Sequence, residues 1–288
     1  MKDNKLQIDI NSHTRLCCIF GNPVKHSLSP VMQNAAFRSC SIDVVYLAFE
    51  VNDIKDAVSA MRSLNIIGAS VTIPFKREIM KYLDHIDPLA DMIGSVNTLK
   101  NNNNRIVGYN TDGQGALSSL IEKGIPVRDS KILILGNGGS ARAIAFTLLK
   151  EDAKIIIAGR NAERVSALVD DLKRGSANVG SLLIKDISLD FMKGIDVIIN
   201  TTPIGMTPKE DYSPLDEKLI LKDHTIFDIV YSPNTTKLLQ IGKSKGCKII
   251  HGIDMLIYQG VKQYEIWTGQ RAPFDVMKKS IEEYISEI

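Results

Sequence analysis

Three small residues in the middle of the chain have the spacing of a phosphate-binding loop. Gly136, Gly138 and Ala141 follow the pattern Gly-x-Gly-x-x-Gly/Ala. In this pattern the first glycine permits a tight turn, the second lets the backbone approach a pyrophosphate, and the third small residue lets a helix pack closely on a strand. The spacing predicts a dinucleotide site, and the alternative is a glycine-rich turn that binds nothing.

Two serines near the start of the chain are candidates for binding a small carboxylate. Ser27 and Ser29 lie two residues apart, just before a predicted helix that runs from Val31 to Cys40. The amino terminus of a helix attracts anions, and hydroxyl groups can hydrogen-bond a carboxylate. The alternative is that Ser29 only caps the helix and Ser27 is a turn residue.

Two ionisable residues follow predicted strands. Lys76 follows a predicted strand that Pro74 ends, and Asp112 follows a later strand directly. Taken alone, each residue also has an interpretation that involves no function. Most lysines are solvated surface charges, and Asp112 could cap the helix that contains Leu117.

The elements that would position these residues alternate in the first half of the chain. Apolar runs at 16–20, 44–49 and 69–73 predict strands, and helical patterns separate them. Such alternation favours a mostly parallel sheet, whose ligands lie outside the carboxyl ends of the strands. A polar tip at 101–104 predicts a hairpin, whose second strand leads to Asp112.

The second half repeats the alternation and predicts a doubly wound domain. The apolar run Ile132–Leu135 leads into the glycine loop, and a helical apolar stripe follows it. Further strands are predicted at 154–158, 182–184, 196–199, 225–229 and 248–250. The fold class is therefore α/β with two domains: an amino-terminal α/β domain with a mostly parallel sheet, which the resemblance described below implies to be substrate-binding, and a Rossmann-like doubly wound domain.

Composition argues against nucleic-acid and membrane partners. The 288 residues are 44% hydrophobic and 24% charged, with a net charge of +2, which are ordinary values for a globular protein. Neither a signal core in residues 1–5 nor an apolar run of membrane-spanning length is present. The four cysteines lack Cys-x-x-Cys spacing and no cluster has metal-ligand spacing, so we expect reduced thiols, a cytoplasmic protein and no metal.

Taken together, the motifs resemble those of the shikimate/quinate dehydrogenase family. The resemblance extends from about Leu16 to the carboxyl terminus, and so many matches in order are more specific than any one motif. The matching segments are 27–30, 71–76, 96–98, 110–113, 136–141, 200–206, 228–233 and 252–259.

The resemblance implies a role for particular side chains. Lys76 and Asp112 would form a catalytic pair beside a ring hydroxyl of the substrate. Oxidation of a secondary alcohol requires a proton to leave oxygen as hydride leaves carbon, and such a pair can take the proton and stabilise the alkoxide. Which of the two is the formal base stays open. The substrate-binding positions of the family fall on Ser27, Ser29, Thr72, Asn97, Tyr231 and Gln259.

The family's cofactor positions predict NADP. The second strand of the nucleotide domain is followed by Gly159-Arg160-Asn161, where an NAD enzyme usually has an acidic residue for the ribose hydroxyls. An arginine there suits a 2′-phosphate, although Arg164 could share or replace that role. Relatives often have Asn-Arg-Thr at this place, and many have Asn where Ser70 stands. The cofactor positions are Gly136, Gly138, Gly139, Ser140, Ala141, Arg160, Thr202, Ile204 and Gly252.

The resemblance also implies the domain boundaries and the activity. Residues 1–112 plus 253–288 would form the catalytic domain, and residues 113–252 the NADP-binding domain inserted into it. We expect NADP-dependent interconversion of 3-dehydroshikimate and shikimate, with no nucleic-acid or membrane partner and the oligomeric state left open, a homodimer being one option. The alternatives are an enzyme that also uses quinate or NAD, and a non-catalytic nucleotide sensor.

Overall fold

The computed structural model describes residues 10–287 and divides them into two compact units. The first unit holds the described residues up to Thr111 and those from Gln259 onward, and the second is Asp112–Tyr258. The sequence placed the second crossing after residue 252, whereas this division falls inside a helix, after Tyr258. The expectation about residues 1–5 lies outside the described part of the chain.

The first unit is built on a six-stranded sheet in the order β2-β1-β3-β5-β6-β4. β1 pairs in parallel with β2 and with β3, and β5 is antiparallel to both of its neighbours. The two-residue β4 has no sequence signal that we recognised. The strands are β1 Arg15–Gly21, β2 Val44–Glu50, β3 Gly68–Val71, β4 His85–Ile86, β5 Thr98–Asn102 and β6 Arg105–Tyr109.

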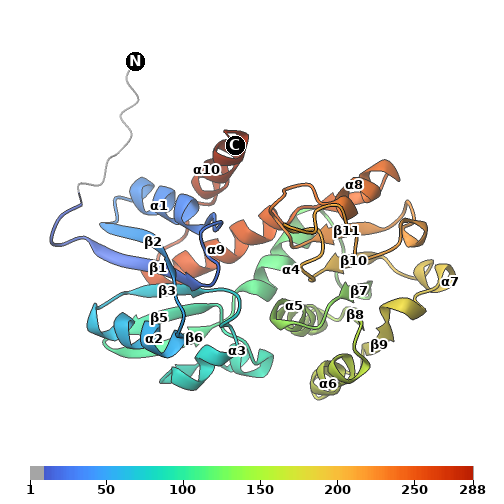
Figure 1. Ribbon diagram of the computed structural model, residues 1–288, viewed down its shortest axis with the longest axis horizontal. Helices are drawn as coiled ribbons and strands as arrows, with labels where there is room; N and C mark the ends of the chain where they lie inside the picture. Colours follow the sequence, from blue (N-terminus) through green and yellow to red (C-terminus); the bar gives the residue numbers. More distant parts are fainter. Residues whose placement is uncertain (1–9, 288) are drawn as a thin grey trace. The chain divides into compact units, whose positions relative to one another are not determined.

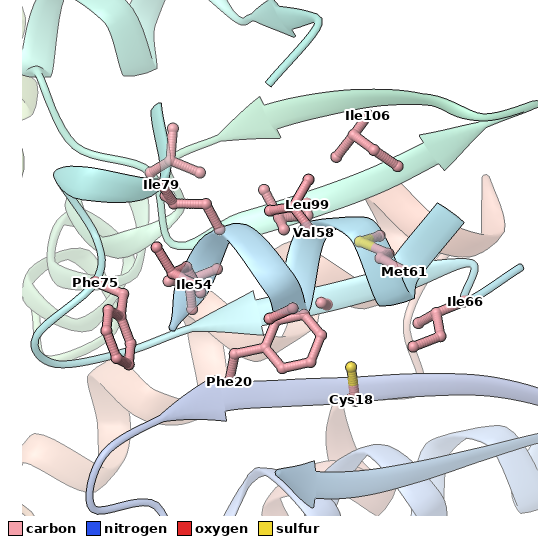
Figure 2. Packing of buried hydrophobic residues seen from close by; sticks show 14 of the residues in the cluster. Cys18, Phe20, Ile54, Val58, Met61, Ile66, Phe75, Ile79, Leu99 and Ile106 are labelled. Carbon is pink, nitrogen blue, oxygen red and sulfur yellow. The ribbon is translucent and has the colours of Figure 1, made fainter. Parts of the chain in front are cut away.

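Helices cover both faces of this sheet (Figure 1). On one face the apolar stripe of α2 packs on buried side chains of β1, β3 and β5, and Figure 2 shows Ile54, Val58 and Met61 of α2 around Phe20 and Leu99. On the other face α1 packs against α10 and β2. The helices are α1 Ser29–Ser39, α2 Ile54–Ser63, η1 Glu78–Tyr82, α3 Pro88–Ile93, the later part of α9 Gly252–Thr268, and α10 Phe274–Ser286.

The predicted hairpin is present and its turn explains the asparagine run. Asn103 and Asn104 both have positive φ, 53° and 68°, as a tight two-residue turn between antiparallel strands requires. Asparagine tolerates this conformation better than most residues. The hairpin brings Thr98 opposite Tyr109, so the residues just before β5 and just after β6 lie at one edge of the sheet.

The second unit contains a parallel six-stranded sheet in the order β12-β11-β10-β7-β8-β9. This order reverses beside β7, which is the doubly wound arrangement predicted from the sequence. The strands are β7 Lys131–Leu135, β8 Lys154–Gly159, β9 Val179–Leu183, β10 Val197–Asn200, β11 Thr225–Asp228 and β12 Lys248–Ile250.

The helices of the second unit follow the strands in the expected alternation. The middle of α5 is buried on almost every side, and the helix's own residues there are mainly Ala, Ile, Phe and Leu. α4 packs against α5, and α6 packs on β8 and β9. The helical elements are α4 Asp112–Glu122, α5 Gly139–Lys150, α6 Ala162–Lys173, η2 Ile184–Asp186, α7 Leu189–Met192, η3 Glu217–Leu219, α8 Lys237–Ser244 and the first part of α9.

The interpretation of Ser29 as a helix cap is wrong. α1 begins at Ser29 itself, and its N-cap residue, Leu28, makes no capping hydrogen bond with its side chain. Ser27 Oγ instead accepts a hydrogen bond from the backbone N–H of Ser29 at 3.3 Å, which orders the loop ahead of the helix. Among residues 10–287 no helix is both long enough and apolar enough to cross a bilayer.

Candidate active site

The loops after β1 and β3 meet at the carboxyl edge of the first sheet. The backbone N–H of Asn22 donates to the carbonyl oxygen of Ile73 at 3.0 Å, and that of Thr72 donates to Phe20 at 2.9 Å. A Cβ placed on Gly21 would lie 2.3 Å from the Thr72 methyl group. Glycine is therefore required where the first loop passes the side chain of Thr72.

Ser27 lies in the loop that follows β1, and Ser29 is the first residue of α1. Ser29 is only 3% exposed, whereas Ser27 is half-buried. Ser29 also hydrogen-bonds the hydroxyl of Tyr46 on β2; burial raises the pKa of Tyr46, and the bonds from Ser70 and Ser29 only partly oppose this. Tyr46 is therefore a neutral phenol at physiological pH and can donate a hydrogen bond.

Asn97, Thr111 and Gln259 form a buried hydrogen-bonded cluster at the same edge. Asn97 Oδ1 accepts from the Thr111 N–H at 2.9 Å, and Asn97 Nδ2 donates to Thr111 Oγ1 at 2.9 Å. Thr111 Oγ1 and Asn97 Nδ2 lie 3.4 and 3.5 Å from Gln259 Oε1. The structure thus brings together two of the predicted substrate residues from distant parts of the chain, and adds Thr111.

Lys76 and Asp112 are each tied to this cluster through the backbone. The carbonyl oxygen of Lys76 accepts from the N–H of Val96, the residue before Asn97, at 2.8 Å. Asp112 directly follows Thr111, is 4% exposed and is the first residue of α4. Lys76 belongs to the first unit and Asp112 to the second.

The glycine loop has the geometry that a pyrophosphate needs. Gly136 follows β7 with φ 112°, and a Cβ there would lie 2.5 Å from Thr201 Oγ1, so only glycine fits. Gly138 is the N-cap of α5, and a Cβ there would meet no heavy atom within 4 Å. That free space, in front of the first N–H groups of a twelve-residue helix, fits a phosphate. Gly139 and Ser140 begin α5, and Ala141 is fully buried.

The end of β8 carries a cation instead of a carboxylate. Gly159 closes the strand, and its missing side chain leaves room for Val165 of α6. Arg160 comes next and is exposed, and Asn161 caps α6 by accepting from the Arg164 N–H at 2.8 Å. Of these residues, Arg160 and Arg164 are available for an anionic group.

The predicted nicotinamide-side residues surround a buried polar centre that the sequence did not reveal. Asn200 Oδ1 accepts from the N–H and the hydroxyl of Thr202, at 3.0 and 2.7 Å, and Asn200 Nδ2 donates to the carbonyl of Ile204 at 3.1 Å. Asn200 Nδ2 also donates to Asp228 Oδ1 at 2.9 Å. The ends of β10 and β11 are thereby linked.

Asp228 in turn orders the segment that leads to Tyr231. Its carboxylate accepts from the Val230 N–H at 3.0 Å and from Thr236 Oγ1 at 2.7 Å. Gly252 lies close behind, since a Cβ there would lie 2.5 Å from the carbonyl oxygen of Ile229. Tyr231 is half-buried, and burial raises its pKa.

A cavity of about 520 Å³ lies at the opposite, amino-terminal edge of the second sheet. Asp196, Thr225 and Lys248, which precede or begin strands, contribute to its lining, and none of the predicted site residues does. Ligands of doubly wound sheets bind at the carboxyl ends of the strands, so we place the cofactor site at the glycine loop. Within residues 10–287 no group of three or more His, Cys, Asp or Glu side chains could hold a metal ion.

A mixed α/β unit joined to a doubly wound unit with a dinucleotide-binding loop is typical of dinucleotide-dependent oxidoreductases. Three family profiles match the chain: the shikimate dehydrogenase substrate binding domain at residues 19–99, shikimate/quinate 5-dehydrogenase at 116–237, and the shikimate 5-dehydrogenase C-terminal domain at 252–282.

Individual relatives agree with the profiles. Shikimate dehydrogenase (NADP⁺) of Methanocaldococcus jannaschii is 44% identical over 283 residues, which is 96% of this chain and 100% of the relative. A shikimate dehydrogenase crystallised with NADP⁺ has a TM-score of 0.90 at 42% identity, covering 96% of this chain and 97% of its own. The Listeria monocytogenes enzyme with shikimate and NAD has a TM-score of 0.88 at 34% identity, covering 96% and 100%. The chain belongs to the shikimate dehydrogenase family.

Proposed function

We propose that this protein catalyses the reversible NADP-dependent reduction of 3-dehydroshikimate to shikimate. The observation that carries the proposal is the cluster of Asn97, Thr111 and Gln259 at the carboxyl edge of the first sheet. Amide and hydroxyl groups of this kind suit a ring that bears several hydroxyls. Family membership supplies the substrate, since relatives of nearly full coverage carry the name shikimate dehydrogenase.

The substrate would lie over the loops after β1 and β3. Ser27 and Ser29 would bind its carboxylate at the start of α1, where the helix amino terminus favours an anion. Thr72, Asn97 and Gln259 would hydrogen-bond the ring hydroxyls. Tyr231 would also contact the substrate, as the family resemblance implies.

Lys76 and Asp112 would handle the proton of the reacting hydroxyl. NADP, when bound, accepts the hydride that leaves the ring carbon. The pair takes the hydroxyl proton as the carbon–oxygen double bond forms, and the Lys76 ammonium stabilises the developing negative charge on oxygen. In the direction of reduction the same groups return a proton to the oxygen.

The residues of the second unit fit NADP. The free space at Gly138 would take the pyrophosphate, and Arg160 would pair with the 2′-phosphate. Thr202, Ile204 and Gly252 would line the nicotinamide side, held by the hydrogen bonds of Asn200 and Asp228.

The experiment that tests the proposal is a steady-state assay of the purified protein with NADP and shikimate, followed by the absorbance of NADPH. We expect turnover with shikimate and a higher kcat/KM for NADP than for NAD. The same assay with quinate measures dual substrate use. Tight NADP binding without turnover of either acid would refute the proposal and favour a nucleotide sensor.

A further inference from the structure

Three buried polar side chains form a continuous chain behind the proposed substrate residues. Tyr46 comes from β2, Ser70 from β3 and Gln263 from α9, and they are 0%, 4% and 1% exposed. The three lie in different elements of the first unit. Polar groups buried to this degree are costly unless each is hydrogen-bonded, so their arrangement calls for an explanation.

The hydrogen bonds run in one direction through the three residues. The Tyr46 hydroxyl donates to Ser70 Oγ at 2.7 Å, and the Ser70 hydroxyl donates to Gln263 Oε1 at 2.9 Å. Gln263 Nε2 then donates to Thr98 Oγ1 at 3.1 Å, and the Thr98 hydroxyl donates to Asn97 Oδ1 at 2.7 Å. Gln263 Nε2 also donates to the backbone carbonyl oxygen of Asn97 at 3.4 Å. A carbonyl oxygen can only accept, so Gln263 Oε1 must face Ser70, and because each hydroxyl has one proton the direction of the other bonds follows.

This series of hydrogen bonds ends on the amide of Asn97 and, together with the backbone N–H of Thr111, sets its orientation. Asn97 Oδ1 accepts from the Thr98 hydroxyl and from the backbone N–H of Thr111. A backbone N–H can only donate, so an Asn97 amide turned by half a rotation would place its own N–H₂ against two donors. The Nδ2 group must therefore face Thr111 Oγ1 and Gln259 Oε1.

We propose that Gln263 is a positioning residue for substrate binding: together with Ser70 and Thr98 it holds the Asn97 amide in the orientation that binds the substrate ring. This inference rests on the proposed function, because it takes Asn97 as a substrate contact. Tyr46 connects the same chain to Ser29. The series of hydrogen bonds therefore links Ser29, which is proposed to bind the carboxylate, with Asn97, which is proposed to bind the ring.

The first test is the variant Gln263→Met, which keeps the length of the side chain and removes its hydrogen bonds. Loss of one buried positioning bond is worth about tenfold in binding, so we expect the KM for shikimate to rise about tenfold. The KM for NADP should not change, because Gln263 lies in the first unit. An unchanged KM for shikimate, or an equal rise in both KM values, would overturn the proposal.

A matched pair at Thr98 tests the same chain without altering Gln263. Thr98→Val keeps the shape of the side chain but removes the hydroxyl, and should raise the KM for shikimate as Gln263→Met does. Thr98→Ser keeps the hydroxyl and should restore the wild-type value. If the KM for shikimate rose equally in both variants, packing would matter and the hydrogen bond would not. A wild-type KM in both variants would contradict the inference.

A double-mutant cycle separates positioning from general damage. If Gln263 acts through Asn97, Gln263→Met should cause no further rise in the KM for shikimate once Asn97 is alanine. Multiplying effects would contradict the inference. Wild-type protein that does not oxidise shikimate refutes the proposed function itself, whereas active wild type with an unaffected Gln263→Met variant refutes only the positioning role.

Discussion

In the sequence, Lys76 cannot be distinguished from an ordinary surface lysine. In the structure, a backbone hydrogen bond fixes the position from which its side chain extends. It follows the strand β3, and its carbonyl oxygen is bonded to the residue before Asn97. The side chain therefore starts from a fixed point at the edge where the polar cluster lies. Proton transfer needs a group whose position is set before the substrate arrives.

We predict that Lys76→Ala lowers kcat for shikimate oxidation at least about a hundredfold, the usual effect of losing a proton-transfer group. The matched control is Lys81→Ala, at an exposed lysine in η1, which should leave kcat unchanged. Both values come from the NADPH assay. Activity that largely survives Lys76→Ala would remove this residue from the catalytic pair.

The cofactor preference is predicted to depend on the cation after β8. Arg160→Ala should lower kcat/KM with NADP by about tenfold to a hundredfold, as expected for a lost charge-assisted bond. The value with NAD should change little, because NAD has no 2′-phosphate. Arg164→Ala is the comparison, and a larger effect there would transfer the role from Arg160 to Arg164.

The elements that the sequence predicted are those with a strong local signal. One example is the run Ile132–Leu135, whose apolar residues, including β-branched isoleucines, favour a strand. Another is the turn at 103–104, because asparagine tolerates positive φ. β4 has two residues and exists only because β6 is beside it. No local sequence pattern predicts a strand of this kind.

The polar networks could not be predicted for a related reason. Ser70 and Gln263 are 193 positions apart in the chain, and each is an unremarkable residue type. Their pairing depends on α9 returning to the sheet opposite Thr98. Single residues in recognisable motifs, such as Asn97 and Gln259, were found, but the side chains that orient them come from outside those motifs.

At the scale of elements, the carboxylate of Asp228 should make the second unit sensitive to pH. Burial raises the pKa of Asp228 to about 6, and bonds from Thr236, Val230 and Asn200 and the charge of His251 only partly oppose this. The folded state therefore holds this proton more tightly than the unfolded state. The resulting stabilisation is complete below about pH 4 and is lost as pH rises through about 6.

We expect Asp228→Asn to abolish this dependence, because an amide cannot ionise. Relative to the variant, wild type should lose about 2 kcal/mol of unfolding free energy between pH 4 and pH 7. Urea unfolding followed by circular dichroism measures the difference. Trp267 is the only tryptophan and lies in the first unit, so its fluorescence serves as an internal control. A difference between the two proteins that is constant with pH would contradict the prediction.

At the scale of the whole molecule, the chain enters the second unit once and leaves it once. The first crossing falls between Thr111 and Asp112, and the second falls within α9 between Tyr258 and Gln259. The second unit is therefore inserted into the first. Each crossing lies beside a proposed functional side chain: Asp112 begins α4 directly after the first crossing, and Gln259 follows the second crossing within α9.

This organisation predicts that the two ligands protect different segments from hydrogen exchange. NADP alone should slow exchange in the glycine loop at 136–141 because its pyrophosphate would accept bonds from those amides. Shikimate alone should slow exchange at Ser27–Ser29, where its carboxylate would bind. Mass spectrometry of peptides from the full-length protein measures both, with residues 162–173 of α6 as a region expected to respond to neither. Protection of the glycine loop by shikimate, or of Ser27–Ser29 by NADP, would mean that the ligands have been assigned to the wrong units.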